Sequence, residues 1–324
     1  MHPPNFWRHG ANPGLPALLS PLAAITAAIT ARRVARLGWR APVPVICCGN
    51  LTVGGAGKTT VALDLAARLL AQDRRVHVLL RGYGGSSRGV RRVGADDPFA
   101  LVGDEAKLLA AVAPTWIGGD RAASARAAIA AGAEVLVMDD GLQNPTLQKT
   151  LSLLVIDGGY GFGNRRVLPA GPLREAIAAG AARCHAAVLI NTDQTRAEQL
   201  LPAGLPVLRA GLIPEAGISA FVGKRVLAFA GIATPEKFFS GIEIAGAIVV
   251  ARHSFPDHHP FTSRELVSIV ADATALDATV VTTPKDMVRI PTSSRAGIFQ
   301  VGISLEWQDA AALDRLLASL WNSP

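Results

Sequence analysis

The segment GGAGKT, Gly54–Thr59, constrains the fold of this chain more than any other feature. It directly follows a continuous apolar run over Val43–Cys48, which predicts a buried strand, and it opens a helix predicted over Thr59–Leu70. A glycine-rich turn that leads from a strand into a helix and ends in Lys-Thr is typical of a phosphate-binding P-loop. The glycines let backbone N–H groups surround phosphate oxygens, and the helix N-terminus adds partial positive charge. We therefore expect the chain to bind a nucleotide on an α/β fold.

Each part of this segment has an expected role in holding the nucleotide. Lys58 is expected to reach the β- and γ-phosphates, and the hydroxyl of Thr59 to bind Mg²⁺. The first position of the loop, usually glycine, is Thr52, and the rest of the pattern is intact. The predicted phosphate-binding residues are Thr52, Val53, Gly54, Gly55, Ala56, Gly57, Lys58 and Thr59.

A second segment, Glu134–Gly141 (EVLVMDDG), is a predicted strand that ends in two acids. Ligands of parallel α/β sheets bind beyond the carboxyl ends of the strands, so Asp139 and Asp140 are expected beside the P-loop. An aspartate in this position holds Mg²⁺ directly or through a water. The sequence does not say which of the two contacts the ion.

Apolar runs alternate with helical stretches along most of the chain. This alternation predicts a P-loop NTPase-like parallel sheet covered on two sides. The alternation of strands and helices begins again near residue 220, which predicts a smaller α/β lobe. The expected division is an N-terminal helix over residues 1–40, a nucleotide-binding core over 41–220 and a smaller C-terminal lobe over 221–324. That lobe is expected to include a final amphipathic helix at Asp309–Trp321. Further predicted core strands are Val76–Leu80, Val135–Met138, Leu151–Ile156 and Ala186–Ile190.

Charge and cysteine content narrow the class of protein only slightly. The formal net charge is +7, which fits nucleic acid, an anionic membrane or a phosphorylated substrate as partner. The three cysteines, Cys47, Cys48 and Cys184, show no Cys-x-x-Cys spacing. We expect them to be reduced core residues rather than a disulfide or a zinc site.

The N-terminal part is uncharged and mostly apolar from Gly14 to Ile29, and Arg32, Arg33 and Arg36 follow at once. A secretory signal would carry its basic cluster before the apolar run. The run is also shorter than the roughly 20 residues that span a bilayer. An interfacial helix with arginines on anionic headgroups is the favoured interpretation. The alternative is an ordinary helix that packs on the core.

A P-loop by itself does not distinguish a kinase from a switch or a motor. A GTPase needs Asn-Lys-x-Asp after a later strand, and the segment with Asn191 and Asp193 lacks the lysine. Elements typical of nucleic-acid motors are not found, so no nucleic-acid partner is expected.

Several further segments occur in the order seen in tetraacyldisaccharide 4'-kinases, and the chain resembles that family from about residue 5 to about residue 290. Thr60 stands where that family commonly has proline. The segments that carry the resemblance are GNLTVGGAGKT (Gly49–Thr59), RGYGG (Arg81–Gly85), GDE (Gly103–Glu105), DDGLQ (Asp139–Gln143), LPAGPLRE (Leu168–Glu175) and DHH (Asp257–His259).

The resemblance implies an ATP- and Mg²⁺-dependent enzyme of lipid A biosynthesis. Such an enzyme transfers the γ-phosphate of ATP to the 4'-hydroxyl of a tetraacylated glucosamine disaccharide 1-phosphate. It acts at the cytoplasmic face of the bacterial inner membrane, beside anionic lipid and with no obligate protein partner. The resemblance also implies a hinge between the P-loop core and the smaller lobe. The alternative function is a membrane-associated P-loop NTPase switch that acts on a protein partner.

The resemblance also assigns roles to residues whose sequence context alone leaves alternatives open. Asp104 begins a predicted helix, where an acid is a common cap, but the resemblance makes it the general base for the sugar hydroxyl. It places Glu105 at the Mg²⁺ site and makes His258 the residue that orients Asp104 from the second lobe. For His258 the alternatives are a metal site with Asp257 and His259, or a solvated loop.

Four more residues are expected to contact substrate or phosphate at the carboxyl end of the sheet. The alternative for the arginines is a surface salt bridge. These residues are Arg81, Tyr83, Gln143 and Arg174.

Overall fold

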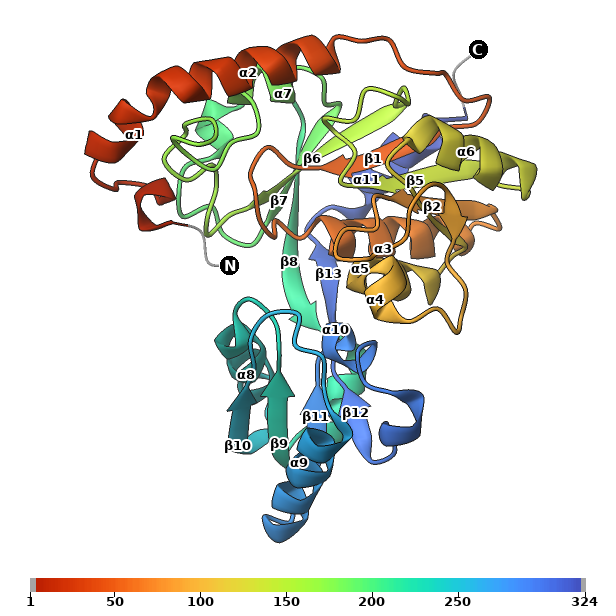
Figure 1. Ribbon diagram of the computed structural model, residues 1–324, viewed down its shortest axis with the longest axis vertical. Coiled ribbons are helices and arrows are strands. Elements are labelled where there is room, and N and C mark those ends of the chain that lie inside the picture. Colours follow the sequence, from red (N-terminus) through yellow and green to blue (C-terminus); the bar gives the residue numbers. More distant parts are fainter. Residues whose placement is uncertain (1–3, 322–324) are drawn as a thin grey trace.

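The computed structural model describes residues 4–321, so the outermost residues of the expected terminal ranges, 1–3 and 322–324, lie outside it. Its larger lobe is built on a nine-stranded sheet in the order β13-β8-β7-β6-β1-β5-β2-β4-β3 (Figure 1). Neighbouring strands from β8 to β4 are parallel, and both edge strands are antiparallel to their neighbours. The strands are β1 Val45–Gly49, β2 Val76–Leu80, β3 Arg91–Arg92, β4 Thr115–Ile117, β5 Val135–Asp139, β6 Leu151–Asp157, β7 Ala186–Ile190, β8 Val207–Pro214 and β13 Ile303–Trp307.

Helices cover both faces of this sheet, as the continuous apolar runs require. All five residues of β1 are buried, as are those of β2, β5 and β7, because each strand has a hydrophobic layer on either side. One layer includes α3 (Lys58–Leu70), α5 (Asp104–Ala110) and α11 (Ala310–Ala318). The other includes α6 (Arg121–Ala130) and α7 (Ile177–Ala181). The predicted α/β fold is confirmed. Short helices elsewhere in this lobe are η1 Asn5–Trp7, α4 Phe99–Val102 and η2 Glu198–Leu200.

The smaller lobe contains a four-stranded, fully parallel sheet in the order β10-β9-β11-β12. Its two apolar clusters lie on opposite faces of the sheet, one around Phe261 and Leu266, the other around Phe239 and Ile242. Its strands are β9 Arg225–Ala230, β10 Ile248–Ser254, β11 Thr279–Thr282 and β12 Ile298–Gln300, and its helices are η3 Ala216–Phe221, α8 Pro235–Ile244, α9 Ser263–Ala275, α10 Pro284–Met287 and η4 Thr292–Ser294.

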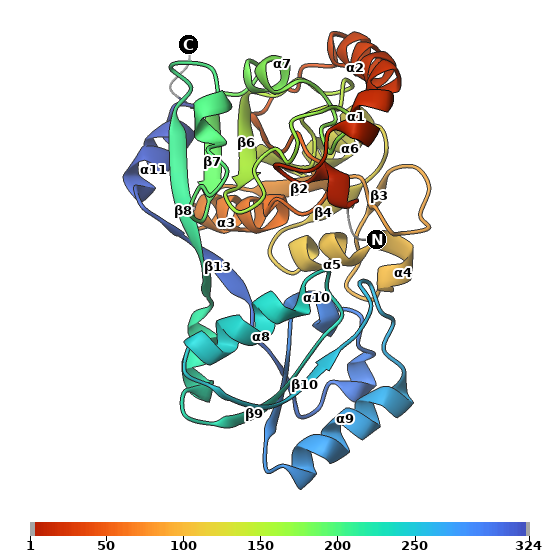
Figure 2. The ribbon, with the colours of Figure 1, turned by 90° about the vertical axis from the view of Figure 1, so that its left-hand side faces the viewer.

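The last part of the chain returns to the larger lobe, which differs from the expected division. β13 pairs antiparallel with β8 from Ile303 to Trp307, and α11 buries Leu313 and Leu317 against the core that also contains α3. The final helix was expected in the smaller lobe because it follows that lobe in the sequence. Its apolar face completes the larger core instead. The smaller lobe is therefore an insertion between β8 and β13, and these two strands connect the lobes (Figures 1 and 2).

The N-terminal segment forms two consecutive helices, α1 (Gly14–Leu18) and α2 (Ser20–Val34). They lie along the outside of the larger lobe, on the side away from the smaller lobe (Figure 1). In the part of the chain that the structure describes, no helix is long and apolar enough to cross a membrane.

The insertion topology predicts that α11 stabilises the larger lobe. Leu313→Ala removes a fully buried side chain and should lower the free energy of unfolding by about 2–5 kcal/mol. Urea denaturation of this variant, followed by the fluorescence of the nearby tryptophans, measures the change. Val267→Ala on the exposed face of α9 is the matched control and should change stability by less than about 0.5 kcal/mol. Equal effects of the two substitutions would contradict the packing of α11.

Candidate active site

The P-loop lies between the end of β1 and the start of α3, in the predicted position. Gly57 precedes α3 with a φ of 83°, and a Cβ there would lie 2.5 Å from the Cδ1 of Ile190. Glycine is therefore favoured at this position, chiefly because its positive φ is rare for residues with a side chain. A second segment also contacts the loop, because the N–H of Val53 donates to the carbonyl of Pro172 at 2.8 Å. The LPAGPLRE segment thus supports the nucleotide loop.

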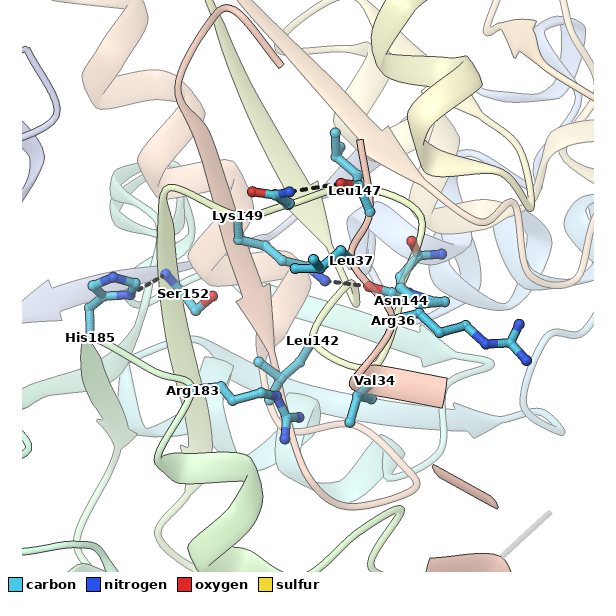
Figure 3. Close-up of a pocket in the computed structure, with 13 residues that line it drawn as sticks. Val34, Arg36, Leu37, Leu142, Asn144, Leu147, Lys149, Ser152, Arg183 and His185 are labelled. Atoms are coloured by element: carbon cyan, nitrogen blue, oxygen red, sulfur yellow. Dashed lines mark hydrogen bonds between the residues drawn. The ribbon is translucent and has the colours of Figure 1, made fainter. Parts of the chain in front are cut away.

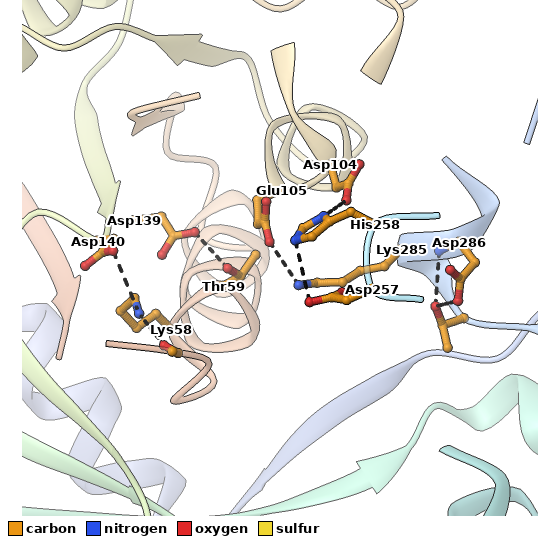
Figure 4. Close-up of polar contacts among 12 residues, drawn as sticks. Lys58, Thr59, Asp104, Glu105, Asp139, Asp140, Asp257, His258, Lys285 and Asp286 are labelled. Atoms are coloured by element: carbon orange, nitrogen blue, oxygen red, sulfur yellow. Dashed lines mark hydrogen bonds and ion pairs between the residues drawn. The ribbon is translucent and has the colours of Figure 1, made fainter. Parts of the chain in front are cut away.

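Lys58 points back over the P-loop. Its Nζ lies 3.5 Å from the carbonyl of Gly54 and 3.9 Å from Oδ2 of Asp140 (Figure 4). Burial lowers the pKa of Lys58, and the charge of Asp140 opposes this effect. A buried ammonium beside the glycine turn can follow the phosphates of a nucleotide.

Asp139 has the geometry of a magnesium ligand. Thr59 donates its hydroxyl to Oδ2 of Asp139 at 2.9 Å, and among the described residues nothing hydrogen-bonds to the buried Oδ1. Burial raises the pKa of Asp139 to about 6. A cation would satisfy this orphaned oxygen, so Thr59 and Asp139 fit Mg²⁺. The described residues contain no cluster of three or more His, Cys, Asp or Glu side chains that could hold an ion.

Asp140, the other expected ligand, is directed elsewhere. Its two oxygens accept a bidentate pair of hydrogen bonds from Arg174, at 2.8 and 3.0 Å. Burial would raise the pKa of Asp140, but Lys58 and Arg174 lower it below its usual value. Gln143 is buried and its amide donates to the carbonyl of Asn50 and to Glu175. These contacts make Gln143 a connector between the P-loop and the 168–175 segment.

The structure leaves Arg81 and Tyr83 exposed after the end of β2, with Tyr83 79% exposed.

Arg121 was not predicted from the sequence. It is buried at the start of α6 and donates to the carbonyl of Gly118. Burial lowers the pKa of Arg121 to about 10, and the charges of Asp140 and Asp139 oppose this. No motif marked it, because an arginine after an Asp N-cap is ordinary helix sequence.

Asp104 and His258 meet across the contact between the two lobes, as the resemblance implies (Figure 4). Nδ1 of His258 lies 2.8 Å from Oδ2 of Asp104. The buried Arg289, which follows α10, also binds this oxygen through Nε at 2.8 Å and through Nη2. Burial would raise the pKa of Asp104, but the hydrogen bonds and charge of Arg289, followed by those of His258, lower it.

Glu105, which was expected at the metal, is paired with Lys285 of the smaller lobe. The Nζ of Lys285 donates to Oε1 of Glu105 at 2.9 Å. Burial would raise the pKa of Glu105, and the charge of Lys285 lowers it. Lys285 and Arg289 both belong to TTPKDMVRI (Thr282–Ile290), a segment in which no functional residue was predicted.

His259 does not join a metal site with His258. Its Nε2 lies 3.0 Å from Glu265, and its ring stacks on Phe255. It anchors the 255–260 loop to α9.

The site combines a P-loop, an acidic strand end and a histidine of the second lobe that contacts an acid of the first. This combination is typical of a two-lobed P-loop phosphotransferase.

Comparison with known proteins identifies the family within this class. The family model described as Tetraacyldisaccharide-1-P 4'-kinase matches residues 15–322. The tetraacyldisaccharide 4'-kinase of Gluconacetobacter diazotrophicus is 54% identical over 99% of this chain and 98% of its own length. That of Rhodospirillum centenum is 53% identical over 99% and 97%. The chain therefore belongs to the tetraacyldisaccharide 4'-kinase family, whose members are ATP-dependent phosphotransferases, and the resemblance is confirmed.

The fold agrees with a solved structure. The chain is similar to a crystal structure titled as the "apo" form of LpxK from Aquifex aeolicus in complex with ATP, with a TM-score of 0.77 and 27% identity. The match covers 95% of this chain and 99% of that one. ATP binding is thus supported at the level of the family.

A separate cavity of about 260 Å³ lies between the end of α2 and the loop that follows β5 (Figure 3). Its lining includes Leu37, Leu147, Lys149 and His185. Among the described residues, none of the P-loop or of the Asp104 contact lines it. The cavity is therefore separate from the site above, and within it the Nζ of Lys149 donates to the carbonyl of Asn144.

Lys58→Ala should abolish phosphoryl transfer and weaken ATP binding, because it removes the charge that accompanies the migrating phosphoryl group. Transfer from γ-labelled ATP and calorimetric titration with ATP measure the two effects. Lys224→Ala, an exposed lysine of the smaller lobe, is the control. Full activity of the Lys58→Ala variant would contradict the assignment of the P-loop to the catalytic site.

Proposed function

We propose that this chain transfers the γ-phosphate of ATP to the 4'-hydroxyl of a tetraacylated glucosamine disaccharide 1-phosphate. The observation that carries the proposal is the contact of Asp104 with His258 beside the P-loop. Lys58 and Thr59 begin α3, Asp104 and Glu105 begin α5, and the two helices pack in one apolar layer on the same face of the sheet. A phosphate donor and a proton-abstracting pair thus share one site between the lobes.

The proposed roles follow from the contacts. The P-loop backbone and Lys58 bind the phosphates, and Thr59 and Asp139 would hold Mg²⁺, which neutralises charge on the phosphates when bound. Arg174 is held at the edge of the P-loop by Asp140 and is partly exposed, so it can meet a further phosphate oxygen. Asp104 and His258 together accept the proton of the acceptor hydroxyl.

Incubation with γ-labelled ATP and the disaccharide 1-phosphate, followed by chromatography of the lipid, tests the function. A labelled lipid that appears only with the acceptor supports the proposal. Slow ATP hydrolysis at an equal rate with and without the acceptor, with no labelled lipid, would favour the membrane-associated switch instead.

The proposal includes peripheral binding to the cytoplasmic face of the bacterial inner membrane. Five large apolar side chains of α1 and α2 are between 49% and 76% exposed, and they recur at spacings of three and four residues along one helical face. This pattern does not suit a core-packing helix, since the buried residues of α1 and α2 are only Pro16, Ala23 and Thr30. An unpartnered apolar stripe of this length suits a lipid surface that also holds the acylated acceptor. The stripe consists of Leu15, Leu18, Leu22, Ile25 and Ile29.

The charge around the stripe supports an anionic surface. No Asp or Glu occurs in the sequence before Asp64, while Arg32, Arg33 and Arg36 follow the stripe directly. A hollow of about 280 Å³ between α1 and the loop that contains Arg165 and Arg166 is also basic. Among the described residues no ion pair neutralises either of these two arginines. Such cations attract phosphate headgroups.

The triple substitution Leu22→Ser, Ile25→Ser, Ile29→Ser should release the protein from membranes. Full burial of one such side chain contributes about 1.5–3 kcal/mol, so partial loss at three positions should weaken vesicle binding about tenfold or more. Sedimentation with vesicles of phosphatidylglycerol and phosphatidylethanolamine measures this. The matched control replaces Ile244, Ile248 and Val267, exposed residues of the smaller lobe, by serine. If the control weakens binding equally, the stripe is not the membrane contact.

Asp104 and His258 should behave as one catalytic unit. Asp104→Ala and His258→Ala should each lower kcat by about 10²–10⁴-fold, and the double variant should be little worse than the poorer single variant. ATP affinity should survive, because neither residue belongs to the phosphate cradle. A double variant whose defect equals the product of the two single defects would show that the residues act independently.

A further inference from the structure

The cavity between the end of α2 and the loop that follows β5 has no part in the roles proposed above (Figure 3). Its volume of about 260 Å³ has room for a small polar ligand. Arg36, Lys149 and Arg183 line it, and among the described residues of the lining there is no carboxylate. A hollow whose charged groups all have one sign attracts ions of the other sign. The expected ligand is therefore an anion.

Lys149 is the cation of this lining that lacks an anionic partner inside the fold. Its side chain is half-buried, and its Nζ donates to the carbonyl of Asn144. An ammonium has three donors, and no other acceptor within residues 4–321 contacts this one. Burial lowers the pKa of Lys149, and the charge of Arg183 lowers it further. An anionic ligand would supply the acceptors that the protein itself does not provide.

The other two cations of the lining differ from each other in their pairing. Arg183 donates to Oε1 of Glu175 at 2.7 Å, so its charge is largely balanced. Arg36 is exposed just beyond the end of α2, and no carboxylate of the described chain contacts it. The cavity thus has one unpaired cation in its interior and a second at its mouth.

The mouth of the cavity is also apolar. Leu37 lines the cavity although the residue is 93% exposed, so it lies at the opening. It follows shortly after α2, the helix whose exposed stripe is proposed to contact lipid. A phosphate ion would leave Leu37 in water, whereas a phospholipid would cover it with the first part of its acyl chains. The combination of an inner cation and an apolar opening therefore favours a lipid over a free anion.

We infer that this cavity binds the headgroup phosphate of an anionic membrane phospholipid, with Lys149 as the donor to the phosphate and Leu37 against the acyl chains. The inference rests on the membrane binding included in the proposed function, and it adds a specific headgroup site to the general attraction of the stripe and its arginines. The lining comes from both the end of α2 and the core of the larger lobe. A bound lipid would therefore connect the membrane helix to the catalytic lobe.

A soluble short-chain lipid tests the site without a membrane surface. Dihexanoyl phosphatidylglycerol, kept below its critical micelle concentration, should bind the wild-type protein in a calorimetric titration. Lys149→Gln should weaken this binding about tenfold or more, because it removes a charge-assisted hydrogen bond. Lys237→Gln, the same substitution at an exposed lysine of α8, is the matched control and should stay within about twofold of wild type. Equal affinities of the Lys149→Gln variant and the wild-type protein would overturn the inference.

Two further probes identify the part of the lipid that is recognised. Inorganic phosphate should bind about tenfold more weakly than phosphatidylglycerol, because it cannot cover Leu37. Dihexanoyl phosphatidylcholine, whose headgroup has no net charge, should also bind about tenfold more weakly. Leu37→Ser should weaken the binding of phosphatidylglycerol and leave that of phosphate unchanged, while Ile244→Ser, at an exposed residue of the smaller lobe, changes neither. Phosphate that binds as tightly as the lipid would assign the cavity to a free anion and refute the lipid assignment.

The acceptor of the proposed reaction also carries a phosphate, and kinetics separate it from a membrane lipid. In neutral detergent micelles without phospholipid, Lys149→Gln should keep its KM for the acceptor within about twofold of the wild-type value. A KM raised about tenfold would place the acceptor in the cavity and overturn the inference. Absence of lipid phosphorylation by the wild-type protein would instead refute the proposed function, and the titrations would still decide about the cavity. If Lys149→Gln does not fold, the titrations of Leu37→Ser decide.

Discussion

The buried ion pair between Arg289 and Asp104 is the contact on which the arrangement of the site depends. The two charges come from different lobes, and both side chains are at most 5% exposed. Removal of water from two charges is costly, so such a pair adds little net stability, but loss of one partner leaves a buried charge uncompensated. The pair therefore disfavours other placements of the lobes more than it stabilises this one. Under the proposed function, this contact helps to hold Asp104 beside His258.

The topology explains why one ion pair can have this effect. The smaller lobe is inserted between β8 and β13, so within residues 4–321 the two strands that pair in the larger sheet also provide the only covalent connections between the lobes. A connection of two strands allows one lobe to bend relative to the other but restricts sliding between them. Loops at the end of the smaller sheet carry His258 and Arg289. On the opposite side of the larger lobe lie α1 and α2 (Figure 2). The side chains of their apolar stripe are exposed.

Local signals in the sequence predicted the five adjacent strands β1, β2, β5, β6 and β7 and the nucleotide loop, because these strands are buried almost throughout and each motif is contiguous. The end of the chain was not predictable in this way. The amphipathic pattern of α11 would suit packing on either lobe. Only the pairing of β13 with β8, nearly a hundred residues apart in the sequence, decides where the helix packs. Arg289 was missed for a similar reason. Its partner Asp104 is 185 residues away, and the segment between Lys285 and Arg289 has no pattern of its own.

The choice between Asp139 and Asp140 shows the same limit at the scale of one residue. Both acids follow the same strand, but Asp139 completes β5 in extended conformation, while Asp140 has a φ of 55° and turns its carboxylate toward Arg174. Asp139 keeps an oxygen that no described residue satisfies and so suits a cation.

The ion pairs of the site consequently fall into two kinds. Arg174 and Lys58 share a carboxylate that is 35% exposed, so arriving phosphates can exchange with it at small cost in free energy. The Arg289–Asp104 pair is closed to water and has no such exchange available, because an anion that displaced Asp104 would have to be desolvated in turn. Under the proposed function, the exchangeable pairs lie beside the nucleotide phosphates and the fixed pair lies beside His258. This division of charge would let the site rearrange around ATP while Asp104 and His258 keep their contact.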